Sequence, residues 1–233
     1  MMWGWFDPMY FVFLAPGILL AAWAQWRVKS TYAQANRIPA ASGYTGAEAA
    51  DALLHSAGVH GVAIEPVEGF LSDHYVPGEH VLRLSPDVYA GRSLAALGIA
   101  AHESGHALQD ASRYPLLVAR NFLVPLAGFG SSASWIIMMI GFAFASMNVI
   151  LVGIVAFSLT VVFQLVNLPV EFDASRRARI ALVQGGLISR EEDAEVKKVL
   201  NAAALTYVAG TLTSVLTLLY FLFRSGLLGG RRN

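Results

Sequence analysis

The residues best suited to chemistry are His102, Glu103 and His106, which follow the pattern H-E-x-x-H within an apolar helical run. Residues four apart on a helix lie on the same face, so both imidazoles can point at one metal ion while Glu103 stands beside it. A catalytic zinc needs two neutral nitrogen ligands, a third protein ligand and a position open to water. Glu103 would then take a proton from that water as it attacks a carbonyl polarised by the metal. The alternative is two ordinary histidines that share a helix face, which chance seldom produces at this spacing.

Glu171 is the candidate for the third ligand. The sequence has no cysteine, so any metal site must be built from histidines and carboxylates. Glu171 begins a charged segment after the uncharged run 121–170, and two membrane crossings by that run would return it to the side of His106. A His₂Glu set is one of the ligand sets of catalytic zinc. Alternatively, Glu171 and Asp173 are acidic residues at a helix N-terminus, and we expect Asp173 to be a cap or a support for a ligand.

His74, on a predicted strand ahead of the motif, is a candidate for stabilising the oxyanion of the reaction. A lone histidine is also often structural. The arginines that follow Glu171 are expected to be positive charges next to a membrane span, and one of them could neutralise Asp173 or hold the substrate; they are Arg176, Arg177 and Arg179.

The composition of the chain indicates a membrane protein. Of its 233 residues 56% are hydrophobic and 14% charged, and the mean hydropathy is +0.54, which is too apolar for a soluble domain of this length. The formal net charge is zero, so there is no electrostatic footprint for nucleic acid.

Three uncharged runs are long enough to supply four membrane spans. Residues 8–26 form one span, which we expect to be a retained anchor because no basic segment precedes it as in a signal peptide. The run 121–170 is too long for one span and fits two, at roughly 122–145 and 149–168. Residues 199–223 form a fourth.

The polar segment between the first two spans predicts a small mixed domain. Thr45 and Glu48 form a capping box for a helix that ends near Gly58. Three β-prone runs follow, at 62–65, 70–76 and 80–85. We expect residues 80–85 to be the edge strand that receives the backbone of a peptide substrate.

The distribution of basic residues predicts the orientation of the chain. If the motif lies on the cytoplasmic side, residues 27–120 and 171–198 place thirteen of the sixteen Lys and Arg there. The other three follow the fourth span and are Arg224, Arg231 and Arg232. This bias favours a cytoplasmic site.

Two motifs carry a resemblance to known families. His102-Glu103-x-x-His106 with Glu171-Phe172-x-Ala174 resembles the membrane-bound gluzincins of the HtpX class, although Ser175 stands where that class has Asp. The chain is more similar to the YugP-like family of bacterial neutral zinc metallopeptidases, on the stretches 72–75, 81–85, 101–107 and 168–177. This resemblance covers essentially the whole chain and implies a multi-pass bacterial membrane zinc peptidase.

Together these features predict a mainly α-helical membrane protein, with four transmembrane helices and a small α+β zincin-like domain that carries the motif on a helix. The expected parts are an N-terminal anchor at 1–26, the zincin-like domain at 27–120, a two-span hairpin at 121–170, a third-ligand segment at 171–198, and a fourth span with a short tail at 199–233.

The expected activity is hydrolysis of peptide bonds by a membrane-embedded endopeptidase that binds Zn²⁺ and acts on peptide or membrane-protein substrates at a lipid bilayer. The alternative is a non-catalytic scaffold or regulator with a structural zinc, for which Asp73 or His74 would be the fourth ligand. A transporter is a weaker option, because a translocation path calls for charged residues inside the spans and the predicted spans contain none.

Overall fold

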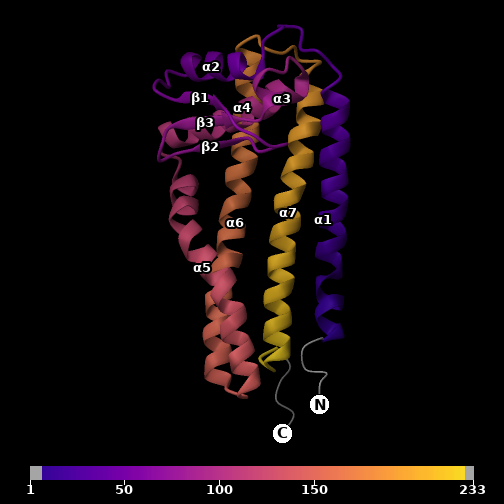
Figure 1. The fold of residues 1–233 in the computed structure, drawn as a ribbon, viewed down its shortest axis with the longest axis vertical. Helices are drawn as coiled ribbons and strands as arrows, with labels where there is room; N and C mark the ends of the chain where they lie inside the picture. The colour runs from indigo at the N-terminus through magenta and orange to yellow at the C-terminus, as the bar shows by residue number, and fades with distance from the viewer. Residues whose placement is uncertain (1–6, 229–233) are drawn as a thin grey trace. The chain divides into compact units, whose positions relative to one another are not determined.

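The computed structural model describes residues 7–228; residues 1–6 of the predicted anchor and 229–233 of the predicted tail, which include Arg231 and Arg232, lie outside the described residues. The fold is mainly helical with one small sheet (Figure 1). Its elements in chain order are α1 Pro8–Ala35, α2 Gly46–Ser56, β1 Ala63–Pro66, β2 His74–Val76, β3 Val81–Leu84, α3 Pro86–Tyr89, α4 Leu94–Ala111, α5 Pro115–Ala143, α6 Met147–Gln184 and α7 Asp193–Arg224.

The chain divides into two compact units. The first, which we call the helical unit, comprises Ala119–Leu168 with the described parts of Met1–Trp23 and Thr206–Asn233. The second, the site unit, comprises Ala24–Val118 and Pro169–Leu205.

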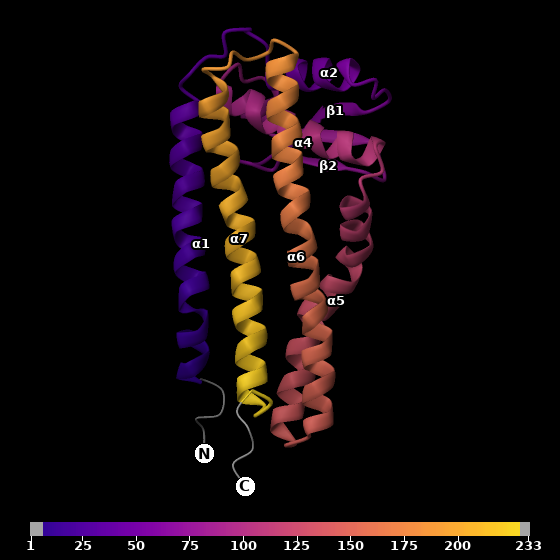
Figure 2. The ribbon, with the colours of Figure 1, turned by 180° about the vertical axis from the view of Figure 1, so that it is seen from behind.

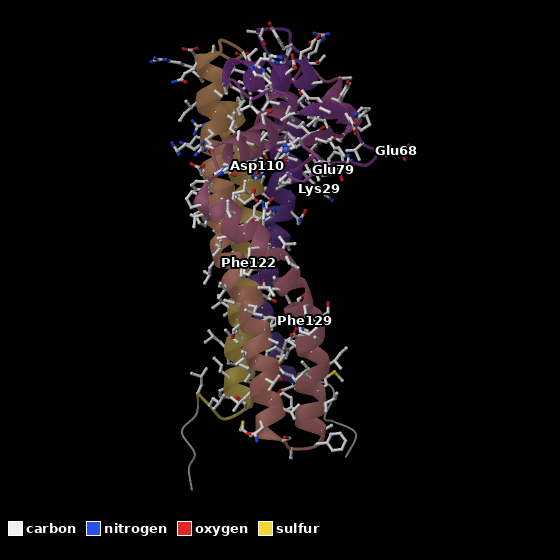
Figure 3. All side chains as sticks on the ribbon, turned by 90° about the vertical axis from the view of Figure 1, so that its left-hand side faces the viewer. Lys29, Glu68, Glu79, Asp110, Phe122 and Phe129 are labelled. Carbon is white, nitrogen blue, oxygen red and sulfur yellow. The ribbon has the colours of Figure 1, made fainter. Side chains whose placement is uncertain are left out.

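Between residues 7 and 228, four helices are long and apolar enough to cross a membrane: α1, α5, α6 and α7. The four predicted spans are therefore confirmed as candidate membrane helices, but each helix is longer than its predicted span because flanking residues are helical as well. In the helical unit, Phe122 and Phe129 on α5 are 71% and 67% exposed (Figure 3). Large apolar side chains left in such exposed positions are suited to a lipid environment.

The sheet of the site unit has the strand order β1-β3-β2, with β1 parallel and β2 antiparallel to β3. Figures 1 and 2 show α2 beside β1. The prediction that residues 80–85 are an edge strand is wrong, because β3 pairs on both sides. Leu82 and Leu84 of β3 are fully buried. Alternation of apolar and polar residues identifies a strand with one buried face, and it occurs in central and edge strands alike.

Helix α4 begins where the side chain of Ser93 accepts a hydrogen bond from the N–H of Ala96. Its small residues allow other segments to approach closely. A Cβ atom at Gly105 would lie 2.6 Å from the carbonyl oxygen of Ala174, so only glycine fits against the site-unit segment of α6. This close approach places residues after Pro169 beside the motif on α4.

Candidate metal centre

Three side chains converge on one point in the site unit. His102 and His106 come from α4 and Glu171 comes from α6, and their ligand atoms all lie within 4.8 Å of one another. Oε2 of Glu171 is 3.3 Å from Nε2 of His102 and 3.5 Å from Nε2 of His106. The four-residue spacing on the helix and the glycine contact between α4 and α6 produce this convergence.

The chemistry of these three groups fits a zinc ion. Oε2 of Glu171 is buried and, within residues 7–228, has no hydrogen-bond partner. Two imidazole nitrogens and a carboxylate oxygen that face one another at such short range are suited to hold a cation between them. Burial lowers the pKa of His106, but the nearby carboxylates of Glu171 and Glu103 outweigh this effect and raise it overall. Two histidines and one carboxylate could therefore form a zinc site.

The Nδ1 atoms of both imidazole rings, on the sides away from Glu171, also have side-chain neighbours. Nδ1 of His102 lies 3.1 Å from Oγ of Ser175, and Nδ1 of His106 lies 3.0 Å from Oε1 of Gln109. Such partners fix the orientation of a ligand ring. Ser175 is thus the side-chain neighbour of His102 on the side away from Glu171. Sequence reasoning missed Gln109, although its position three residues after His106 on one helix face was a usable signal.

Glu103 is partly buried next to this cluster. Loss of water around its carboxyl group raises its pKa, while the neighbouring imidazoles of His102 and His106 lower it, and the net direction is upward. Its Oε2 accepts a hydrogen bond from the backbone N–H of Tyr75 at 3.1 Å. Glu103 is thus held by strand β2.

The structure places His74 and Asp73 outside the three-residue cluster. His74 is exposed on β2, and its Nδ1 lies 2.7 Å from the carbonyl oxygen of Ser72. Oδ1 of Asp73 accepts hydrogen bonds from the N–H and the hydroxyl of Ser85. Among the described residues the candidate site thus has three protein ligands, which is typical of catalytic rather than closed structural zinc sites. A role of His74 in the reaction stays a prediction.

The charged residues after Glu171 bind one another. Asp173 pairs with Arg176 and Arg177 and accepts a hydrogen bond from Gln109. Nε of Arg179 donates to Asp193 at 2.8 Å. Of the two uses expected for the arginines, neutralisation of Asp173 is therefore the one that fits these contacts.

Comparison with known proteins agrees with this geometry. The sequence model of a family described as "Putative neutral zinc metallopeptidase" matches residues 10–226. The chain is 46% identical over 214 residues to the "Putative membrane protease YugP" of Bacillus subtilis (strain 168), an alignment that covers 91% of this chain and 95% of that protein. No solved structure gives a significant match. The match over nearly the whole chain shows that it belongs to this family of neutral zinc metallopeptidases.

Proposed function

We propose that the protein is a membrane-bound zinc endopeptidase in which His102, His106 and Glu171 hold the metal and Glu103 is the general base. The observation that carries this proposal is the convergence of the three ligand atoms, one of them an unpartnered buried carboxylate oxygen, with Glu103 beside them. In this assignment residues 27–120 and 171–198 together form the zincin-like catalytic part.

Peptide hydrolysis at this site would use the metal to activate the carbonyl group and water, and Glu103 to transfer the proton. Zinc, when bound, polarises the scissile carbonyl and lowers the pKa of water from about 15.7 to roughly 7. Glu103 takes a proton from the attacking water, whose oxygen forms a bond to the carbonyl carbon. The C–N bond then breaks, and Glu103 delivers the proton to the leaving nitrogen. Partial burial of Glu103 suits both roles because its raised pKa lies nearer to neutral pH.

Strand β2 is the proposed docking edge for the substrate backbone. Tyr75 pairs with Leu82 of β3, but its N–H donates to Glu103 instead of to β3. The edge of β2 opposite β3 therefore faces the general base, and Glu103 holds the N–H of Tyr75 on that edge. An extended peptide that adds to this edge would have its backbone held beside Glu103.

Tyr75 also attaches β2 to α4 through its side chain. Its hydroxyl donates to Oδ2 of Asp110 at 2.9 Å. Asp110, which is labelled in Figure 3, lies at the C-terminal end of α4. Burial and the bond to Asp110 both raise the pKa of Tyr75, so it is a neutral donor.

We therefore expect Tyr75→Phe to raise the KM for a peptide by about 10- to 150-fold, because a hydrogen bond to a charged group contributes about 1.5–3 kcal/mol and about 1.4 kcal/mol corresponds to a tenfold change. Zinc affinity should not change. The measurement is steady-state cleavage of a fluorogenic peptide. The control is Tyr89→Phe, which makes the same chemical change at another tyrosine packed against the same hydrophobic cluster as Tyr75 and does not remove the hydrogen bond to Asp110. An unchanged KM in Tyr75→Phe would contradict the role of β2.

The bias of basic residues supports a cytoplasmic site, and Glu171 directly follows an uncharged run. We therefore propose that the substrates are membrane proteins or peptides at the membrane surface. A soluble peptide that is cut faster than any detergent-solubilised membrane protein would count against this substrate class.

The experiment that tests the function is metal analysis beside proteolysis of the full-length protein in detergent. We expect about one zinc per chain, loss of casein cleavage after removal of the metal with a chelator, and recovery on addition of zinc. Metal-stripped protein that still cleaves casein at the original rate would refute the proposal.

A further inference from the structure

We propose that Gln109, oriented by Asp173, is a positioning residue that fixes the proton of His106 on Nδ1 and so leaves Nε2 free to bind a metal. This inference rests on the proposed function, because it assigns His106 as a ligand. Neither Gln109 nor Asp173 belongs to the three-residue cluster.

Gln109 is fully buried, and its side-chain amide has three polar neighbours within 3.0 Å. Nε2 lies 2.8 Å from the carbonyl oxygen of Val170 and 3.0 Å from Oδ2 of Asp173. On the other side, Oε1 lies 3.0 Å from Nδ1 of His106.

These neighbours determine which way the amide faces. An amide has two N–H donors and one acceptor oxygen. The groups at Val170 and Asp173 are both acceptors, so the NH₂ end must face them; the reversed amide would place oxygen against two oxygens. Oε1 of Gln109 must therefore face His106, where it can only accept a hydrogen bond.

The consequence for His106 follows from the chemistry of imidazole. Because Oε1 of Gln109 accepts, Nδ1 must carry the proton. A neutral imidazole then has its one lone pair on Nε2, the nitrogen that faces Glu171. Gln109 thus selects the tautomer that a metal requires.

Asp173 holds this arrangement from the α6 side. Its carboxylate pairs with Arg176 and Arg177, which keep it charged and in place. Val170 and Asp173 flank Glu171 on α6, so the same amide that orients one ligand on α4 also binds the backbone beside another ligand. Gln109 therefore sets both the tautomer of His106 and its distance from Glu171.

Removal of the amide should weaken the metal site without removing any ligand. In Gln109→Met the side chain keeps a similar length but neither accepts from Nδ1 nor donates to Asp173. The imidazole is then free to move its proton to Nε2, where it can donate to Glu171, and zinc must displace that hydrogen bond. Loss of such a partner typically costs 10–100-fold in metal affinity.

The test is zinc affinity of the full-length protein in detergent, by competition with a chelator, beside ¹⁵N NMR of the histidine rings in metal-free protein at a pH above the pKa of His106, where the ring is neutral. For Gln109→Met we expect about 10–100-fold weaker zinc binding and a shift of the His106 ring from the Nδ1–H toward the Nε2–H tautomer. Asp173→Asn, which keeps an acceptor but loses the charge, should change both in the same direction by less. Gln184→Met, at an exposed end of α6, is the control and should change neither.

Two outcomes separate this inference from the proposed function. If His106→Ala abolishes zinc binding while Gln109→Met binds zinc as the wild type does, the positioning role of Gln109 is refuted and the metal site stands. If the wild type binds no zinc, the proposed function fails. An unchanged tautomer of His106 in Gln109→Met would then refute the positioning role of Gln109 as well. Asp173→Asn gives the same readouts if Gln109→Met does not fold.

Discussion

Glu171→Gln is expected to lower zinc affinity by more than about 100-fold and to abolish proteolysis, since loss of a ligand should exceed the 10–100-fold cost of losing a partner of a ligand. The carboxylate faces both imidazoles from α6, and its Oε2 has no hydrogen-bond donor among the described residues. Glutamine has nearly the same shape but no negative charge, so packing at the 4%-exposed position should be retained while the ligand is lost.

The measurement is zinc content after dialysis, with peptide cleavage on the same samples. Glu195→Gln is the matched control, because Glu195 pairs with Lys198 on α7 and is not one of the three candidate ligands. Retention of zinc at wild-type affinity in Glu171→Gln would show that another residue is the third ligand. Thermal unfolding of both variants in chelator separates loss of metal from loss of fold.

The parts of the site that could be predicted from sequence are those that depend on local spacing. His102 and His106 share a helix face because of helical periodicity alone. Glu171 could be predicted as the third ligand because the chain has no cysteine and because the uncharged run before it is long enough for two membrane crossings. The structure brings these three predicted ligands together, although their binding of zinc remains a proposal.

The parts that could not be predicted depend on contacts between distant segments. Gln109 acquires its role only because Gly105 lets α4 approach the carbonyl group of Ala174. The order of the strands was missed for a similar reason, since the residues of β3 alternate in the same way whether one or two strands pair with it. The predicted domain boundary at 170/171 lies within the continuous helix α6, and as a functional division it stays a proposal.

Glu103→Gln is expected to have the opposite pattern from Glu171→Gln: zinc is retained, and kcat/KM falls about 10²–10⁴-fold, the usual contribution of general acid–base catalysis. The amide oxygen of glutamine can still accept the hydrogen bond from the N–H of Tyr75, so β2 should keep its attachment. What the variant loses is a group that can take a proton from water. The KM for a peptide should therefore change little.

The comparison of these two variants decides whether Glu103 acts on the reaction or on the metal. Glu79→Gln is the control, because it makes the same chemical change in the turn between β2 and β3, where Glu79 pairs with Arg83 (Figure 3). Its activity should equal that of the wild type. If Glu103→Gln lost zinc as Glu171→Gln is expected to, Glu103 would be part of the metal site. If Glu103→Gln kept both zinc and full activity, the general base would be a different residue, and the exposed His74 on the neighbouring strand would be the next candidate. Loss of activity with zinc retained is the one result that fits a base held by β2 beside the three ligands.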